Sequence, residues 1–354
     1  MKFDRYIFFQ LAGASILATS GLLFVTVPGV AVGAMSRLPG VGTLTFIKYM
    51  PFAIAMFVPF VVPIAFLLAV VSTYGRLAQD SEWTAMNMTG INPYRLLLPA
   101  LLLGLLVTGV TFFTHAEVLP RLDRMKKAFR VEALRGVVKN LSPGRTELHH
   151  GEFHLIAQDR RDNVFYDALI ELPLSQAEGT AVLDADAVRI EFTPMHLLAT
   201  LRGIRIAHGS QGGRFEQATV KVPIDRLVGG DEPDYVRENY LTTRGLLRGL
   251  DSGTLTPKQV IRFELALHRR MANAATGIVF VLLGVSTGLL MRRGTQLAAL
   301  AVSAGYALLY WILSLRLGHE MVTAGVIAPW TGAWGPLVLY ALLGGFLTWK
   351  VFRQ

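Results

Sequence analysis

The sequence predicts an α-helical polytopic membrane protein with six transmembrane helices, three on each side of an inserted polar domain. The first observation behind this prediction is the distribution of charge. The chain has 354 residues with 34 basic and 25 acidic side chains, 59 in all, of which 44 lie in residues 117–270 and only 15 in the other 200. A soluble protein of this length carries roughly 25% charged residues throughout. The split therefore excludes a purely soluble enzyme.

The second observation is a set of six windows without Asp, Glu, Lys or Arg. A helix needs about 20 mostly apolar residues to cross a membrane, and each window is long enough for one such helix: 6–36, 49–75, 96–116, 271–291, 294–315 and 321–349. The first window is too long for the core of a cleaved signal peptide, which spans about 7–15 residues. We therefore expect residues 1–118 to hold helices one to three and residues 271–354 to hold helices four to six.

Basic residues in the short connections predict the orientation, because Lys and Arg are retained in the cytoplasm. With the N-terminus inside, the inner connections hold eight basic residues: Lys2, Arg5, Arg76, Arg95, Arg292, Arg293, Lys350 and Arg353. The short outer loops then hold only three, Arg37, Lys48 and Arg316. The bias predicts a multi-pass membrane protein with both termini in the cytoplasm. The polar insertion is then outside, which is the periplasm if the host is Gram-negative, and the membrane is then the inner one.

Three parts can be distinguished in the insertion. Residues 119–140 have helical periodicity and are expected to extend the third helix outward. Residues 141–228 are expected to form a β-jellyroll-like domain or a small sandwich, because short β-rich runs alternate with Gly, Pro and Asp clusters. These runs are 152–158, 164–172, 187–192, 197–207 and 214–224. Residues 229–270 regain helical character, and Thr256 and Pro257 fit an N-cap and first helical position.

Motifs for catalysis are missing from the chain. The sequence has no GxxxxGK[ST] loop, HExxH, GxSxG or dinucleotide fingerprint, so we expect no enzyme, no cofactor bound by this chain and no nucleic-acid partner. It has no cysteine, which removes disulfides and thiolate metal sites. His149, His150 and His154 are candidate metal ligands by residue type. Without an accompanying carboxylate and histidine pattern, exposed histidines are the favoured interpretation, and no metal is expected.

The windows also lack an energy source. Ion-coupled carriers keep charged side chains within their membrane spans, and these windows contain none. If the protein transports a substrate, the energy must come from a partner such as a cytoplasmic ATPase. Residues 80–90 predict a short inner helix, capped by Asp80 or Ser81 and ended by Gly90. It is either a coupling helix that receives the push of an ATPase or an interfacial connector with an aromatic membrane anchor. Its notable side chains are Glu82, Trp83 and Met86.

At this point the residues resemble a known family. Residues 59–99, PFVVPIAFLLAVVSTYGRLAQDSEWTAMNMTGINPYRLLLP, are similar to the signature region of the lipopolysaccharide export permeases, the paired F and G subunits also called the YjgP/YjgQ family. FELALHRR at residues 263–270, GLLMRRG at residues 288–294 and the outer TTRGLLRGLDSGTLTPKQ stretch agree. The resemblance covers nearly the whole chain and does not separate the F from the G subunit.

The resemblance implies a permease subunit of an ABC-type exporter that takes lipopolysaccharide from the inner membrane and passes it to a periplasmic bridge. The implied partners are a paralogous six-span subunit, a cytoplasmic ATPase dimer that uses the ATP, the periplasmic bridge proteins and lipopolysaccharide itself. The alternative, from the residues alone, is a membrane-anchored scaffold or sensor whose outer β domain binds a ligand or partner.

The resemblance also implies roles for individual residues. Glu82 would face the ATPase. Lys127 and Arg130 match basic positions near the outer mouth of the substrate cavity, and Arg37 and Arg316 would close the first and fifth spans there, where cations suit the phosphates of lipid A. The competing interpretation is that these cations bind any anionic headgroup or extend to the membrane surface.

Glycines and prolines in the spans carry two further expectations. Gly284 and Gly288 form a GxxxG motif that is expected to pack helices within this chain. Pro59 and Pro63 are expected to kink the second span.

Overall fold

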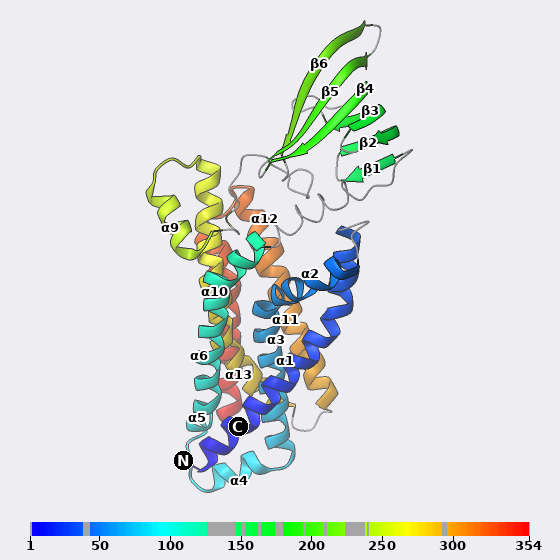
Figure 1. Ribbon diagram of the computed structural model, residues 1–354. Coiled ribbons are helices and arrows are strands. Elements are labelled where there is room, and N and C mark those ends of the chain that lie inside the picture. Colours follow the sequence, from blue (N-terminus) through cyan, green and yellow to red (C-terminus); the bar gives the residue numbers. More distant parts are fainter. Residues whose placement is uncertain are drawn as a thin grey trace. The chain divides into compact units, whose positions relative to one another are not determined.

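The protein folds into two compact units in a computed structural model (Figure 1). One unit is helical and comprises Met1–Gly33, Met50–Arg124 and Arg237–Gln354; the other comprises Ala34–Tyr49 and Met125–Val236 and contains the β-sheet. The structure describes residues 2–37, 43–125, 146–150, 153–161, 164–173, 180–193, 196–208, 211–223, 238, 241–291 and 296–353. Each unit is considered by itself below.

Six helical segments are long and apolar enough to cross a membrane, as the charge-free windows predict: Phe3–Gly33, Val58–Gln79, Pro93–Met125, Pro257–Leu290, Ala298–Thr323 and Pro329–Arg353. The helices before the insertion are α1 (Lys2–Arg37), α2 (Thr43–Ala55), α3 (Val58–Gln79), α4 (Glu82–Met88), α5 (Pro93–Leu96), α6 (Leu98–Phe113) and the π-helix η1 (Thr114–Val118). Those after it are α9 (Thr243–Asp251), α10 (Pro257–Leu290), α11 (Gln296–Trp311), the π-helix η3 (Ile312–Leu317), α12 (Gly318–Thr323) and α13 (Pro329–Arg353).

Glycines hold the centre of the helical unit together. A Cβ added to Gly284 would lie 2.6 Å from Val70 Cγ1, and one added to Gly288 would lie 2.8 Å from the Gly75 nitrogen, so no larger side chain fits where α10 meets α3. In lipid, helices associate through such close packing because the surrounding hydrocarbon offers no hydrophobic driving force. The expected packing of this GxxxG motif within the chain is confirmed.

The second span differs from the sequence prediction of one helix kinked by two prolines. Helix α2 ends at Ala55, and α3 begins after a turn in which the Phe57 N–H donates to the Ile54 carbonyl at 2.9 Å. A proline ring clashes with the carbonyl four residues earlier, and Pro59 would meet that of Ala55. Pro59 therefore lies in the first turn of a new helix, where its missing N–H costs nothing. Pro63 is accommodated inside α3.

The chain returns from the insertion through a well-capped helix. At the start of α10 the Thr256 side chain and the Gln259 side chain form a reciprocal capping box, with Gln259 Oε1 accepting from the Thr256 N–H at 2.9 Å. The expected N-cap at Thr256 is thus confirmed. Helix α10 has 34 residues, about 50 Å at 1.5 Å per residue. It is therefore long enough to cross a membrane and to project beyond it.

The described strands form one antiparallel sheet in which each strand pairs with the next: β1 (Thr146–His150), β2 (Phe153–Arg161), β3 (Val164–Pro173), β4 (Thr180–Phe192), β5 (His196–His208) and β6 (Gln211–Pro223). Buried apolar side chains from β2 to β5 share a core, among them Leu155, Phe165, Ile170, Val188 and Leu201. Antiparallel strands were expected here, while a jellyroll arrangement stays a prediction.

Two features of the sheet were missed in the sequence. Strand β4 begins seven residues before the expected start at Ala187, although Asp184 and Asp186 look like a break. Both carboxylates are paired across the strands by one guanidinium, with Arg205 lying 3.3 Å from Asp184 and 3.0 Å from Asp186. Cross-strand pairs of opposite charge stabilise a sheet. Strand β1, which carries His149 and His150, was not predicted.

Candidate functional site

A cavity of about 440 Å³ lies in the helical unit at the end where the chain leaves for the insertion and returns from it. We call this the insertion end, and the opposite end, with α4 and both termini, the α4 end (Figure 1). The cavity, here named the arginine pocket, is lined by Met56, Phe60, His115, Leu119, Pro120, Asp123, Glu238, Arg262, Leu265, Ala266, Arg269, Arg270, Asn273 and His319.

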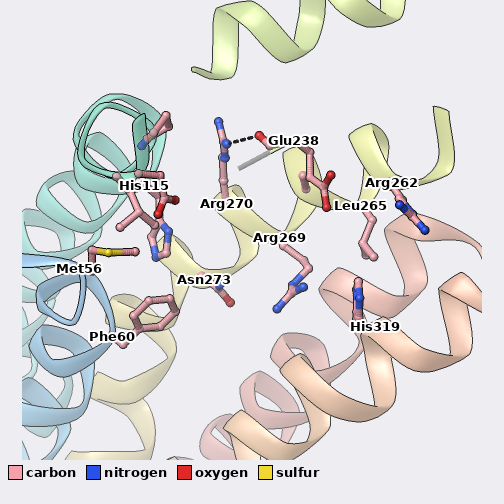
Figure 2. Close-up of a pocket in the computed structure, with 14 residues that line it drawn as sticks. Met56, Phe60, His115, Glu238, Arg262, Leu265, Arg269, Arg270, Asn273 and His319 are labelled. Atoms are coloured by element: carbon pink, nitrogen blue, oxygen red, sulfur yellow. Dashed lines mark hydrogen bonds between the residues drawn. The ribbon is translucent and has the colours of Figure 1, made fainter. Parts of the chain in front are cut away.

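Arg270 is a structural member of this pocket. Its side chain is only 8% exposed, and its guanidinium donates to the carbonyl oxygens of Glu238 at 3.1 Å and Leu241 at 2.8 Å and to Thr243 Oγ1 at 3.4 Å. Hydrogen bonds from a charged donor contribute more than neutral ones. Arg270 therefore fastens the segment before α9 to α10, and Figure 2 shows this contact.

Arg269 is the preceding residue of α10 but has different surroundings. It is half-buried, and no hydrogen bond or ion pair joins it to another residue in the described part of the chain. Figure 2 shows Arg269 and Asn273 extending from α10 into the pocket, with His115 and Phe60 on one side and His319 on the other. Arg269 acts electrostatically on both histidines. Its cation is thus available to a ligand.

Two buried histidine nitrogens also lack partners. His115 is 5% exposed, and its Nε2 has no hydrogen-bond partner among the described residues; the same holds for His319 Nδ1. A buried polar atom without a partner costs free energy unless a ligand or water satisfies it. The ring of His115 packs edge-on against Phe60, with ring centroids 5.3 Å apart.

π-helical turns place these histidines. His115 lies in η1, and His319 is the second residue after η3. A π-turn inserts an extra residue into a helix and frequently occurs at functional sites. Both turns fall where an apolar span ends. The sequence pattern did not predict these turns.

The short helix expected around residues 80–90 is present as α4 (Glu82–Met88). Trp83 stacks on Phe352 of α13 with centroids 5.8 Å apart and meets Tyr74 of α3 edge-on at 6.1 Å. Met86 is 5% exposed and packs in the same core. Trp83 and Met86 therefore attach α4 to the bundle. The side chains that α4 leaves exposed are Thr84, Ala85 and Met88, the last at 85%.

Glu82 lies in the first turn of α4 and is half-exposed. The Tyr6 hydroxyl of α1 donates to Glu82 Oε1 at 3.4 Å, which is a long contact. The predicted cap differs in detail, because Ser81 precedes α4 in a left-handed conformation at φ 63° without a capping hydrogen bond. The left-handed end at Gly90, at φ 78°, is as expected. Asn92 caps α5 by accepting from the Tyr94 N–H at 3.0 Å.

The structure does not bring the remaining predicted site residues together at one site. Lys127 and Arg130, with the rest of the expected extension to residue 140, lie outside the described residues. Arg37 is the last residue of α1 and Arg316 lies in η3, and only their backbone is described. Of the three histidines weighed as a metal site, His149 is opposite His154 in the sheet, and His154 Nδ1 lies 3.4 Å from Glu171 Oε2.

These features define a polytopic membrane protein with a short helix attached to one end of its spans and a cation-lined cavity at the other. The family described as lipopolysaccharide export system permease LptF/LptG matches residues 5–350, and the chain belongs to this family. It is therefore a component of lipopolysaccharide export and a transporter permease rather than an enzyme. No curated protein matches the sequence.

Proposed function

We propose that this chain is one permease subunit of an ABC-type exporter that extracts lipopolysaccharide from the inner membrane and passes it to a periplasmic bridge. A paralogous six-span subunit would complete the pair, and a cytoplasmic ATPase dimer would supply the energy. Membership of the family carries the proposal. The charge-free windows support it, because a permease whose apolar windows contain no Asp, Glu, Lys or Arg lacks the usual coupling residues of an ion-driven carrier and needs an external motor.

In this proposal α4 is the coupling helix, with Glu82 facing the ATPase. The contacts of α4 favour this role over that of a membrane anchor. Trp83 is stacked on α13 and in contact with α3 rather than directed away from the bundle. A displacement of α4 would therefore be passed to both helices through packed rings. Its exposed face, which includes Met88, is free to receive the partner.

Substrate recognition would use cations at the outer ends of the spans. Lys127, Arg130, Arg37 and Arg316 are the residues proposed from the family resemblance to contact lipid A phosphates. With both termini in the cytoplasm, the insertion end of the helical unit would be the periplasmic end, at the level where lipid headgroups lie.

The proposal is tested by co-purification of the ATPase with the full-length chain in mild detergent, followed by mass spectrometry. Glu82→Lys should abolish ATPase recovery, because it reverses the charge of the proposed docking residue. Tyr6→Phe is the matched variant that removes the contact to Glu82 and keeps the carboxylate, and it should retain the ATPase. Glu320→Lys is the control at the exposed insertion end.

Two results would contradict the proposal. Full ATPase recovery and normal export with Glu82→Lys would remove α4 from the coupling path. A wild-type preparation that carries neither an ATPase nor lipopolysaccharide would instead favour a scaffold or sensor.

A further inference from the structure

The position of the arginine pocket along α10 indicates its level in the membrane. Arg269 and Arg270 are the last charged residues before the apolar run 271–291. His115 likewise lies at the end of the apolar run of α6, and His319 follows that of α11 and η3. Arginine at such a boundary lies at the level of lipid headgroups. The pocket is therefore placed to meet a headgroup rather than an acyl chain alone.

The polar groups that face the pocket select an anion. A guanidinium stays protonated under all conditions that a protein meets. No hydrogen bond or ion pair joins Arg269 to another described residue, although Glu238 attracts it without forming an ion pair. His115 Nε2 and His319 Nδ1 are each able to donate one hydrogen bond in the appropriate tautomer. A planar guanidinium with nearby N–H donors matches the oxygen atoms of a phosphate group.

Two carboxylates line the same pocket, Asp123 and Glu238, against three guanidiniums. Asp123 and Arg262 both have interactions within the protein. Arg270 is held by three oxygen atoms. Glu238 attracts both Arg269 and Arg270 but forms no ion pair with either. Arg269 is thus the cation left for a ligand, and the excess of positive charge favours an anionic ligand over a cationic one.

Most of the remaining lining residues are apolar, which favours a ligand larger than a free ion. Met56, Phe60, Leu119 and Leu265 form apolar walls beside the charged groups. The cavity of about 440 Å³ falls in the range of about 300–1,000 Å³ that holds small organic ligands, and it is far larger than an inorganic phosphate requires. A phosphate attached to a sugar or glycerol with acyl chains fits both kinds of wall.

We propose that the arginine pocket binds a phosphate group carried by a lipid headgroup, with Arg269 as its cation and His115 and His319 as hydrogen-bond donors. This site lies within a single subunit, and the residues assigned to it are different from Lys127, Arg130, Arg37 and Arg316. The inference deepens the proposed function, because it assigns new residues to the recognition of a phosphorylated lipid. The lipid is lipid A or a phospholipid, and the test separates the two.

The test is a lipid titration of the full-length chain in nanodiscs of uncharged synthetic lipid, with native mass spectrometry as the readout. The probes are bisphosphorylated lipid A, lipid A without phosphates, and phosphatidylglycerol. Arg269→Ala should lower the affinity for the phosphorylated probe at least tenfold, because a charged hydrogen bond contributes about 1.5–3 kcal/mol and a tenfold change corresponds to about 1.4 kcal/mol. His115→Phe and His319→Phe should each lower it about threefold to fivefold. Lys258→Ala, an exposed cation on α10 outside the pocket, should change it less than twofold.

A second variant, Arg269→Gln, keeps the test decisive if the alanine variant does not fold. Lipid A without phosphates should bind wild type and Arg269→Gln equally weakly. Tighter binding of lipid A than of phosphatidylglycerol identifies the exported lipid as the ligand, and equal binding identifies a resident phospholipid; both support the pocket. Affinity that does not depend on Arg269 or on the phosphate would overturn the proposal. Displacement of the lipid by millimolar inorganic phosphate would overturn its lipid part.

The binding assay does not depend on the ATPase. If no ATPase is recovered with the wild-type chain but lipid binding depends on Arg269, the exporter proposal is contradicted and the proposed lipid site in the arginine pocket is supported. If coupling depends on Glu82 as expected but lipid binding does not depend on Arg269, the exporter proposal is supported and the proposed lipid site is contradicted.

Discussion

The two ends of the helical unit differ in the kinds of side chain that they contain. At the α4 end, the rings of Trp83, Phe352 and Tyr74 are in contact, and the Tyr74 hydroxyl donates to the Leu96 carbonyl at 2.7 Å. At the insertion end, arginines and histidines surround a cavity of about 440 Å³. Packed rings transmit a displacement with little loss, whereas a polar cavity provides binding groups. The difference agrees with the two proposals above, in which the ATPase acts on the α4 end and a lipid phosphate binds at the insertion end.

The largest expected effect comes from disrupting the packing of α6 against α10, two helices of the unit that carries both ends. A Cβ at Gly104 of α6 would lie 2.7 Å from Val281 Cγ2 and 3.0 Å from the Gly277 carbonyl oxygen of α10. Gly104→Leu should therefore force α6 from α10 and lower the free energy of unfolding by about 3 kcal/mol. Thermal unfolding of the purified protein in detergent measures this change.

Gly109→Leu is the matched control in the same helix, because a Cβ there meets nothing within 4 Å. It should leave the unfolding temperature unchanged or slightly higher, since leucine favours a helix over glycine. Equal losses from the two variants would show that α6 and α10 are not packed as described.

The next largest effect concerns the insertion end, where Arg270 has a structural role and the adjacent Arg269 is proposed to bind a ligand. Arg270→Ala removes the donor to two carbonyl oxygens and one hydroxyl, so we expect a loss of about 2 kcal/mol in stability. The connector before α9 should also become sensitive to limited proteolysis. Arg269→Ala should change neither quantity appreciably, because no described residue forms a hydrogen bond or ion pair with Arg269. Matching losses of stability would refute the distinction between the two side chains.

The smallest effect concerns the α4 end. Trp83→Ala removes the contacts to Phe352 and Tyr74 and should cost about 1 kcal/mol. Its larger consequence should be uncoupling, with the ATPase bound but export reduced, because α4 would no longer be joined to α13. Thr84→Ala, at an exposed position of the same helix, serves as the control for both measurements. A Trp83→Ala protein that exports normally would exclude the packed rings as the coupling path.

Much of the framework could be predicted from the sequence, because its signals are local. Charge-free windows reveal spans, Gly90 marks a left-handed helix end, and Gly284 and Gly288 mark a close contact. The arginine pocket could not be found in this way. Its main polar residues, His115, Arg269 and His319, are single residues from three spans, and they meet only after folding. Two adjacent arginines also look alike in a sequence, and only their partners distinguish Arg270 from Arg269.

The glycine contacts of α10 have a further consequence for the gene. Gly75 and Gly104 come before the insertion, and their partners Gly288 and Gly277 come after it. Each half of the chain thus supplies one side of both close contacts, and neither contact uses a residue of the sheet. We expect two separately expressed halves, divided within the insertion, to find each other in the membrane and rebuild the helical unit. Continuity of the polypeptide would then serve to deliver the sheet, not to hold the spans together.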